Sequence, residues 1–287
     1  MAVGIVGAGR LGASLGGGLR QAGYDVRAVA SGRLESARSL ASALGDRARA
    51  TSDPGDVLAL CDLVFLTVPD AVIEPLSASL PWQRQHTVVH CSGALGLEAL
   101  TAVTGAGGSP GCVHPLQSFP SRSPEPERFR GVFCGVEAGP NLGPLLESIV
   151  TDLGARSFRL EGVDRALYHA AAVMVSNHVV GLANAAARVW GLAGLPPELG
   201  REALSPLLTS AVQNVARLDF ASALTGPIAR GDAPTVDAHL RALAGEPSLQ
   251  ELYRLLSLEL LRLPLHREAD VAARLKDLLT KGWPSNE

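Results

Sequence analysis

The sequence predicts an α/β fold in the first half of the chain and an all-helical fold in the second. Three observations support this prediction. A short apolar strand at residues 2–6 runs directly into the glycine-rich segment GAGRLG. Strand and helix patterns then alternate to about residue 160, as parallel strands joined by helices do. Beyond about residue 163 only helical patterns follow.

Turn and capping residues divide the first half into its elements. Gly23 and Gly45 are natural ends for helices at 11–22 and 34–44. Asp53, directly before a proline, caps a short third helix. Pro69 ends a strongly apolar strand at 62–68. The remaining strands are expected at 24–30, 48–51, 86–91, 111–114, 132–136 and 156–160, with helices at 71–80 and 97–103 and a surface loop at 118–130.

The second half shows helical periodicity throughout. Residues 164–193 are expected to form one long helix, and Pro196 and Pro197 begin the next. The later helices are expected at 198–218, 235–243, 249–263 and 268–280.

Three glycines in GAGRLG have separate roles. Gly7 allows the tight turn out of the strand, Gly9 lets backbone approach a pyrophosphate, and Gly12 lets the helix press against the sheet. The first N–H groups of that helix then face the phosphates. This context predicts a Rossmann-type domain that binds a dinucleotide. The residues expected to contact the cofactor here are Gly7, Gly9, Arg10, Leu11 and Gly12, with Val68, Pro69 and Asp70 after the fourth strand.

We therefore predict a doubly wound, mostly parallel sheet followed by an all-α domain. The NAD(P)-binding Rossmann domain is expected at residues 1–160. The all-helical domain, for substrate binding or dimerisation, is expected at 161–287.

The end of the second strand indicates NADP rather than NAD. NAD-specific folds place an acidic residue there to hold the ribose hydroxyls. This chain has Ser31 and Arg33 instead, and a hydroxyl and a guanidinium would bind a 2′-phosphate. The alternative is that Ser31 only caps the next helix and Arg33 is a solvated surface charge.

Composition and charge describe a soluble globular protein. Apolar residues make up 47% of the chain and the net charge is −3, so neither nucleic acid nor an anionic membrane is an expected partner. Polar residues within the apolar stretch 170–193 argue against a membrane span. We expect a cytoplasmic protein, with no targeting segment before the first strand. The cysteines Cys61, Cys91, Cys112 and Cys134 lack metal-ligand spacing, so we expect buried thiols and no metal.

A serine and a histidine follow the fifth and sixth strands, at the edge where such sheets bind ligands. Ser92 lies in HCSGA and His114 in HPLQSF. An imidazole and a hydroxyl beside a nicotinamide could polarise a carbonyl or imine, or take the proton of an alcohol. Gly93 and Gln117 are expected to contact the substrate from the same two segments. The alternatives are a turn hydroxyl for Ser92 and a histidine hydrogen-bonded within its loop for His114.

Polar residues also interrupt the long apolar helix. His169 and Asn177 are expected to face the substrate in a cleft between the domains, although a helix–helix or dimer contact would also satisfy them. Arg230, in LTGPIARGD, is a candidate anchor for a substrate carboxylate or for a partner subunit. Asp232 in the same segment is expected to cap the helix that follows.

The motifs GAGRLG, TVPD, HCSGA, HPLQSF, YHAAAVMVSNH and LTGPIARGD together resemble a family of bacterial Rossmann-like oxidoreductases whose helical C-terminal domain has no assigned function. This family resembles the members of the 6-phosphogluconate dehydrogenase-like superfamily. That superfamily also includes pyrroline-5-carboxylate reductases, ketopantoate reductases and deazaflavin-dependent NADP reductases. The resemblance spans nearly the whole chain. It implies an NAD(P)-binding protein and a homodimer joined through the helical domains.

Two comparisons within the superfamily refine the expected chemistry. Hydroxyacid dehydrogenases use a lysine four residues before an asparagine. Here Asn177 matches that asparagine, but Val173 occupies the lysine position, and the only lysines are Lys276 and Lys281. Prephenate dehydrogenases pair a serine with a histidine as Ser92 and His114 are paired here, so the resemblance implies a catalytic His114 oriented by Ser92. Their substrate does not transfer.

The sequence as a whole predicts an NADP-dependent oxidoreductase that moves hydride to or from a small, carboxylated substrate. His114 is expected to act as acid or base, with Ser92 and Asn177 positioning the reacting group. The alternative is a dimeric NADP sensor that performs no chemistry. A reductase for a deazaflavin cofactor is a third possibility, which would need a wider and flatter cleft.

Overall fold

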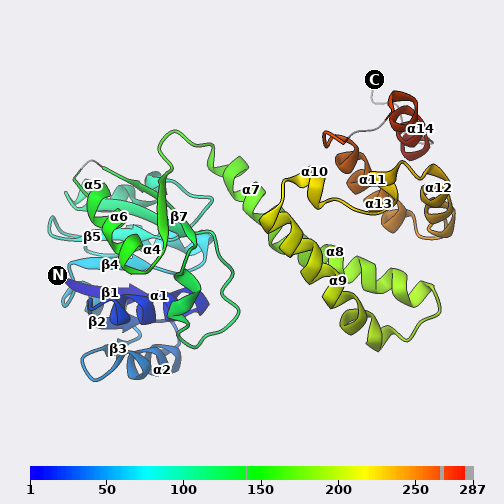
Figure 1. Cartoon of the computed structure of the whole chain (residues 1–287). Helices are drawn as coiled ribbons and strands as arrows, with labels where there is room; N and C mark the ends of the chain where they lie inside the picture. The colour runs from blue at the N-terminus through cyan, green and yellow to red at the C-terminus, as the bar shows by residue number, and fades with distance from the viewer. Residues whose placement is uncertain (140, 266–267, 282–287) are drawn as a thin grey trace. The chain divides into compact units, whose positions relative to one another are not determined.

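The computed structural model describes residues 1–139, 141–265 and 268–281. The chain divides into two compact units, Met1–Ser176 and Asn177–Glu287. Figure 1 labels many of the helices and strands of both. The division falls between Ser176 and Asn177, further along the chain than the boundary at residue 160 expected from the sequence.

The first unit is built on one eight-stranded sheet with the order β3-β2-β1-β4-β5-β6-β7-β8. The first six strands are parallel, β7 runs antiparallel to β6, and β8 is parallel to β7. The order of the first six strands is that of dinucleotide-binding folds, and the predicted fold is confirmed. The strands are β1 Ala2–Val6, β2 Asp25–Ala30, β3 Arg49–Thr51, β4 Leu63–Leu66, β5 Thr87–His90, β6 Ser109–Pro115, β7 Phe133–Ala138 and β8 Arg156–Arg159.

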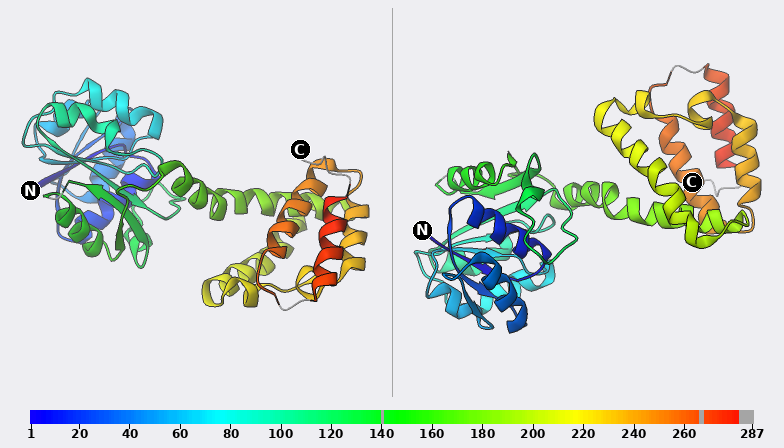
Figure 2. Two further views of the ribbon diagram at one scale, coloured as in Figure 1. Left: turned by 90° about the horizontal axis from the view of Figure 1, so that it is seen from above. Right: turned by 60° about the horizontal axis from the view of Figure 1, so that its bottom comes forward.

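Helices cover both faces of this sheet (Figure 2). Alternate residues of each buried strand point to opposite faces, so Phe65 of β4 packs with α1, α2 and α6, whereas Leu66 packs with α3, α4 and α5. The helical segments are α1 Arg10–Gln21, α2 Leu34–Leu44, α3 Pro54–Leu58, α4 Asp70–Ser79, η1 Leu97–Leu100, α5 Thr101–Gly105, η2 Pro126–Phe129, α6 Gly143–Asp152 and α7 Arg165–Val175.

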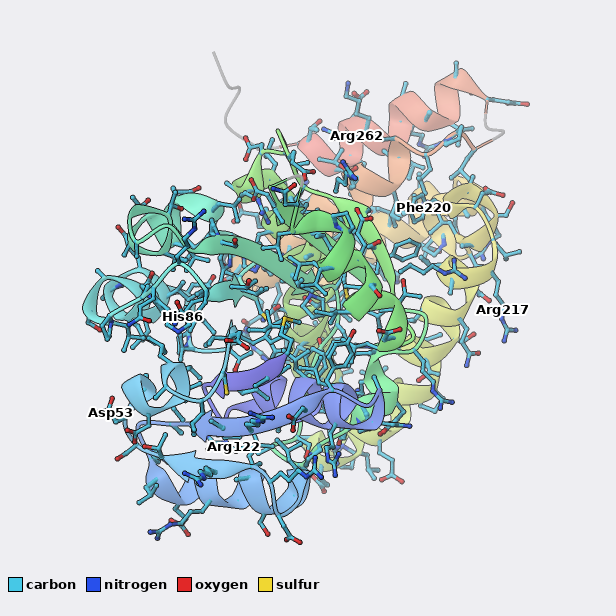
Figure 3. The ribbon with its side chains drawn as sticks, turned by 90° about the vertical axis from the view of Figure 1, so that its left-hand side faces the viewer. Asp53, His86, Arg122, Arg217, Phe220 and Arg262 are labelled. Carbon is cyan, nitrogen blue, oxygen red and sulfur yellow. The ribbon has the colours of Figure 1, made fainter. Side chains whose placement is uncertain are left out.

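Local interactions explain several element ends. Asp53, labelled in Figure 3, accepts a hydrogen bond from the Gly55 amide at 2.8 Å and caps α3 as expected. His86, also labelled, is buried and its Nδ1 accepts from the Gln83 amide at 2.9 Å, which closes the turn before β5.

Two expectations for the first unit need correction. The segment 118–130 is not wholly a surface loop, because η2 buries Phe129 completely in the core. Helix α6 lies between β7 and β8, where the sequence predicts no helix.

The expected long helix at 164–193 is interrupted. Ser176 has φ −116° and ψ −76°, and its hydroxyl donates to the carbonyl of Ala172 at 2.6 Å. Hydroxyls bonded back in this way compete with the helical pattern and often bend helices. The chain therefore forms α7 and, after this residue, α8 Asn177–Leu192.

The second unit is helical in the part of the chain that the structure describes. Its core joins the last four helices through Val236, Leu240, Leu275 and neighbouring apolar residues. Asp232 caps α12, accepting from the Thr235 amide at 3.1 Å. The helices after α8 are α9 Pro197–Arg217, α10 Phe220–Ala223, α11 Pro227–Arg230, α12 Ala233–Ala242, α13 Pro247–Leu261 and α14 Ala269–Thr280.

Helices α8, α9 and α10 bury very little of their own surface. Among their residues only Gly200 is buried, beside the indole of Trp190. Large apolar side chains are correspondingly exposed, including Val180, Leu207, Val212 and Phe220 (Phe220 is labelled in Figure 3). By length and composition alone, the helical stretch 165–192 would be able to span a membrane.

Candidate functional site

The glycine loop after β1 has the geometry that the sequence predicts. Gly7 has φ +117°, a value that favours glycine, and a Cβ there would lie 2.7 Å from the Thr67 carbonyl. A Cβ at Gly12 would lie 2.0 Å from the Gly7 carbonyl oxygen. A Cβ at Gly9, by contrast, would meet no atom within 4 Å. The loop is therefore tightly packed at both ends and open at Gly9, where a phosphate is expected to approach.

The residue directly after β4 supports this loop. The Thr67 hydroxyl donates to the Gly7 carbonyl at 2.7 Å. Helix α1 begins with Arg10 and Leu11 and has no side-chain cap or acidic residue in its first turn, so its N–H groups are not screened by a carboxylate. Val68, Pro69 and Asp70 follow β4 at the same edge of the sheet, and Asp70 is the first residue of α4.

Ser31 and Arg33 lie at the end of β2, as expected. The Ser31 hydroxyl accepts from the Arg33 amide at 3.4 Å, so it supports the turn rather than capping α2, whose N-cap is Arg33 itself. Arg33 is exposed.

His114 lies at the end of β6, against Gly93 and the start of α7. A Cβ at Gly93 would be 2.7 to 3.0 Å from three atoms of the His114 ring, including Nε2 at 2.8 Å. The ring Nδ1 lies 2.7 Å from the hydroxyl oxygen of Tyr168. The His169 ring centroid is 6.1 Å from that of His114, in an edge arrangement. The structure thus brings together His114, Gly93 and His169, three of the predicted site residues, and adds Tyr168.

Burial sets the protonation of this pair at neutral pH. It lowers the pKa of His114 to about 4, and the nearby His169 and Arg165 act in the same direction. Burial likewise raises the pKa of Tyr168 to about 12. His114 is therefore a neutral imidazole and Tyr168 a neutral phenol at pH 7.

An ion pair holds the first turn of α7 on the sheet. Arg165 pairs with Glu137 of β7, and the two side chains are only 11% and 21% exposed. Arg165 Nη1 also lies 3.8 Å from Sγ of Cys112. Arg165, Tyr168 and His169 are spaced i, i+3 and i+4, which places them on one face of α7. That spacing was the available sign in the sequence that Tyr168 and Arg165 belong to this site.

Ser92 is buried, and its side chain forms hydrogen bonds within the turn that contains it. Its hydroxyl oxygen accepts from the amides of Ala94 and Leu95, both at 3.1 Å. The neighbouring His90 is fully buried, accepts from the Ser92 amide at Nδ1 and contacts the Gly96 carbonyl through Nε2. These contacts favour the turn-hydroxyl alternative for Ser92, and they show that His90 shapes the same loop.

Gln117, Asn177 and Arg230 are the remaining site residues that the sequence predicts. The Gln117 amide bonds to its own loop, at the Arg128 carbonyl and the Ser118 amide. Asn177, the first residue of α8, and Arg230, the last of α11, belong to the second unit. All four cysteines are buried as free thiols, as expected. Within the described residues, no group of three or more His, Cys, Asp or Glu side chains could hold a metal ion.

Comparison with family models assigns both halves of the chain. Residues 1–115 match the Rossmann-like domain model. Residues 132–260 match a domain of unknown function, DUF2520. The chain combines a Rossmann-like domain with a DUF2520 domain. This agrees with the resemblance that the motifs show. A comparison with curated proteins finds no match to the sequence.

Solved structures share the fold over nearly the whole chain. A Bacteroides fragilis protein that has been proposed to be an NADP oxidoreductase is 27% identical, with a TM-score of 0.73 over 90% of this chain and 97% of its own. A Thermotoga maritima protein is 26% identical, with a TM-score of 0.69 over 94% and 98%. A pyrroline-5-carboxylate reductase from Streptococcus pyogenes is 16% identical, with a TM-score of 0.63 over 91% and 98%, and shows the fold alone. Prephenate dehydrogenases also share the fold.

Proposed function

We propose that this protein is an NADP-dependent oxidoreductase that transfers hydride to or from a small, carboxylated substrate beside His114. The observation that supports the proposal most directly is the position of His114. Its half-buried imidazole lies at the carboxyl edge of the sheet that also presents the open glycine loop. The similarity to the Bacteroides fragilis protein supports the same class of reaction.

The glycine loop fits a dinucleotide. The space at Gly9 would admit a pyrophosphate against the backbone, and the uncapped start of α1 would donate N–H groups to it. When bound, the cofactor supplies or accepts the hydride. Ser31 and Arg33 would hold the 2′-phosphate that distinguishes NADP from NAD.

Calorimetry with both cofactors tests this assignment. We expect NADP to bind more tightly than NAD, and Arg33→Ala to weaken NADP binding about 10-fold or more, since a charge-assisted contact contributes about 1.5–3 kcal/mol. NAD binding should change little. Equal NADP affinity in the variant would contradict the role of Arg33.

His114 would form a hydrogen bond with the reacting oxygen or nitrogen. Because its pKa is low, the neutral ring would act mainly as a hydrogen-bond donor to a carbonyl or imine at neutral pH. A screen of imines, 2-keto acids and hydroxy acids for NADPH oxidation or NADP reduction would identify the substrate. We expect His114→Ala to lower turnover about 100-fold or more and to leave NADP affinity unchanged. Unchanged turnover would overturn the role.

We further propose a soluble, cytoplasmic homodimer formed through the helices of the second unit. The exposed apolar residues of α8 and α9 support this proposal, since isolated soluble chains rarely expose so many together. The roles proposed for Asn177 and Arg230 in substrate binding remain predictions.

A further inference from the structure

The Tyr168 hydroxyl contacts His114 across 54 residues of sequence and has a space made for it in the sheet. Gly135 of β7 provides that space, since a Cβ there would lie 3.1 Å from the Tyr168 hydroxyl oxygen and 2.5 Å from Leu160. Gly93 provides the matching space for the imidazole. Two glycines on different segments therefore allow the His114 and Tyr168 side chains to meet. The Arg165–Glu137 ion pair holds the turn of α7 that carries Tyr168.

The position of the proton between the two side chains follows from the hydrogen-bond partners that each has. Among the described residues, Nδ1 of His114 is the only hydrogen-bond partner of the Tyr168 hydroxyl. If Nδ1 carried the proton and donated it to the phenol oxygen, the half-buried phenol proton would have no protein acceptor. If the phenol donates to Nδ1, the phenol proton has an acceptor and the ring proton resides on Nε2, where a ligand could accept it.

We propose that Tyr168 is a positioning residue that donates its hydroxyl proton to Nδ1 of His114 and so holds the ring in the Nε2–H tautomer, facing Gly93. Nε2 has no hydrogen-bond partner among the described residues, so its N–H is available to a ligand. A third group that orients a catalytic histidine and fixes its tautomer is an established device in enzymes. The catalytic consequence rests on the function proposed above, whereas the tautomer itself does not.

Nitrogen NMR of the full-length, isotope-labelled protein tests the tautomer without any substrate. Comparison with His114→Gln identifies the ring signals. At about pH 7 we expect a neutral ring with an unprotonated Nδ1 and a protonated Nε2 in the wild type. A protonated Nδ1 would overturn the proposal.

Tyr168→Phe removes only the hydroxyl, and we expect the His114 ring to become a mixture of tautomers. Tyr253→Phe is a matched control because Tyr253 makes the same contact with Nδ1 of His239, at 2.9 Å, in the second unit. It should leave the His114 signals unchanged. An unaltered tautomer pattern in folded Tyr168→Phe would refute the proposal.

Turnover separates this inference from the proposed function. With a substrate found by the screen, Tyr168→Phe should lower kcat about 10- to 100-fold and leave NADP affinity unchanged, as loss of an orienting partner typically does. Tyr253→Phe should retain wild-type kcat. A protein that shows the expected tautomer but no turnover in any variant would refute the proposed function and retain the positioning role.

Discussion

Gly93 leaves the space that the His114 ring fills, so a single methyl group tests their packing. We expect Gly93→Ala to lower the free energy of unfolding by about 1–3 kcal/mol, because the new Cβ would lie within 3.0 Å of three ring atoms. It should also shift the ring signals of His114. Gly181→Ala is the control, since its Cβ would meet nothing within 4 Å in helix α8 and should stabilise the protein by about 0.5–1 kcal/mol. Equal stability of the two variants in urea unfolding would contradict this account.

His90 makes stability depend on pH. Burial lowers its pKa to about 4 in the folded protein, from about 6.5 when unfolded. Between these pH values the unfolded chain binds a proton that the folded protein does not. The contribution of His90 to the free energy of unfolding is therefore complete above about pH 6.5, and it is lost as the pH decreases towards 4.

Urea unfolding at two pH values measures this dependence. We expect His90 alone to cost about 2 kcal/mol between about pH 7 and pH 5, with a further loss from His114, whose pKa is lowered in the same direction. His90→Gln should flatten the dependence even where it lowers stability overall. An unchanged pH slope in that variant would show that other groups cause it.

At the scale of elements, an ion pair between Arg165 and Glu137 contributes to the attachment of α7 to the sheet. Removing the charge of Glu137 leaves the guanidinium of Arg165, only 11% exposed, without its carboxylate. We expect Glu137→Gln to destabilise the protein by about 2–4 kcal/mol. Glu147→Gln breaks the exposed pair with Arg159 and should cost less than about 1 kcal/mol. Similar losses in the two variants, measured by urea unfolding, would contradict the anchoring role.

Elements whose ends are fixed by local residues could be predicted from the sequence. The observed bounds of α2 agree with the prediction, and the caps Asp53 and Asp232 are where the sequence places them, because capping is a contact between near neighbours. The break at Ser176 was missed because the pattern of apolar residues continues through it. Phe129 is buried by contacts with distant segments, which local polarity does not reveal.

The candidate site likewise has a part that local sequence predicts and a part that depends on distant segments. The glycine loop is a local motif with its own backbone geometry, so Gly7, Gly9 and Gly12 could be interpreted before the fold was known. The hydrogen-bond partner of His114 could not be predicted in this way, because Tyr168 reaches the ring through the pairing of β6 with β7 and the attachment of α7. The sequence predicts that Ser92 orients His114. Its hydroxyl accepts from two backbone amides of its own turn, and the predicted role stays a prediction.

At the scale of the whole molecule, the second unit taken by itself leaves an apolar surface exposed. Leu207 and Val212 on α9 are 70% and 54% exposed, and the described core of this unit lies in other helices. Burying one such side chain contributes about 1.5–3 kcal/mol, so a few of them would support a stable pair of subunits. This surface is the basis for the dimer that we propose.

Light scattering with size-exclusion chromatography tests the dimer directly. We expect the wild-type mass to be twice that of one chain, and Leu207→Asp to shift the protein towards the monomer, because an interface cannot bury an unpaired carboxylate cheaply. Val72→Asp, at an exposed apolar position on α4 of the first unit, should remain dimeric. A monomeric wild type, or one that stays in solution only with detergent, would contradict the proposal. The second result would indicate that the apolar stretch 165–192 meets lipid instead of another subunit.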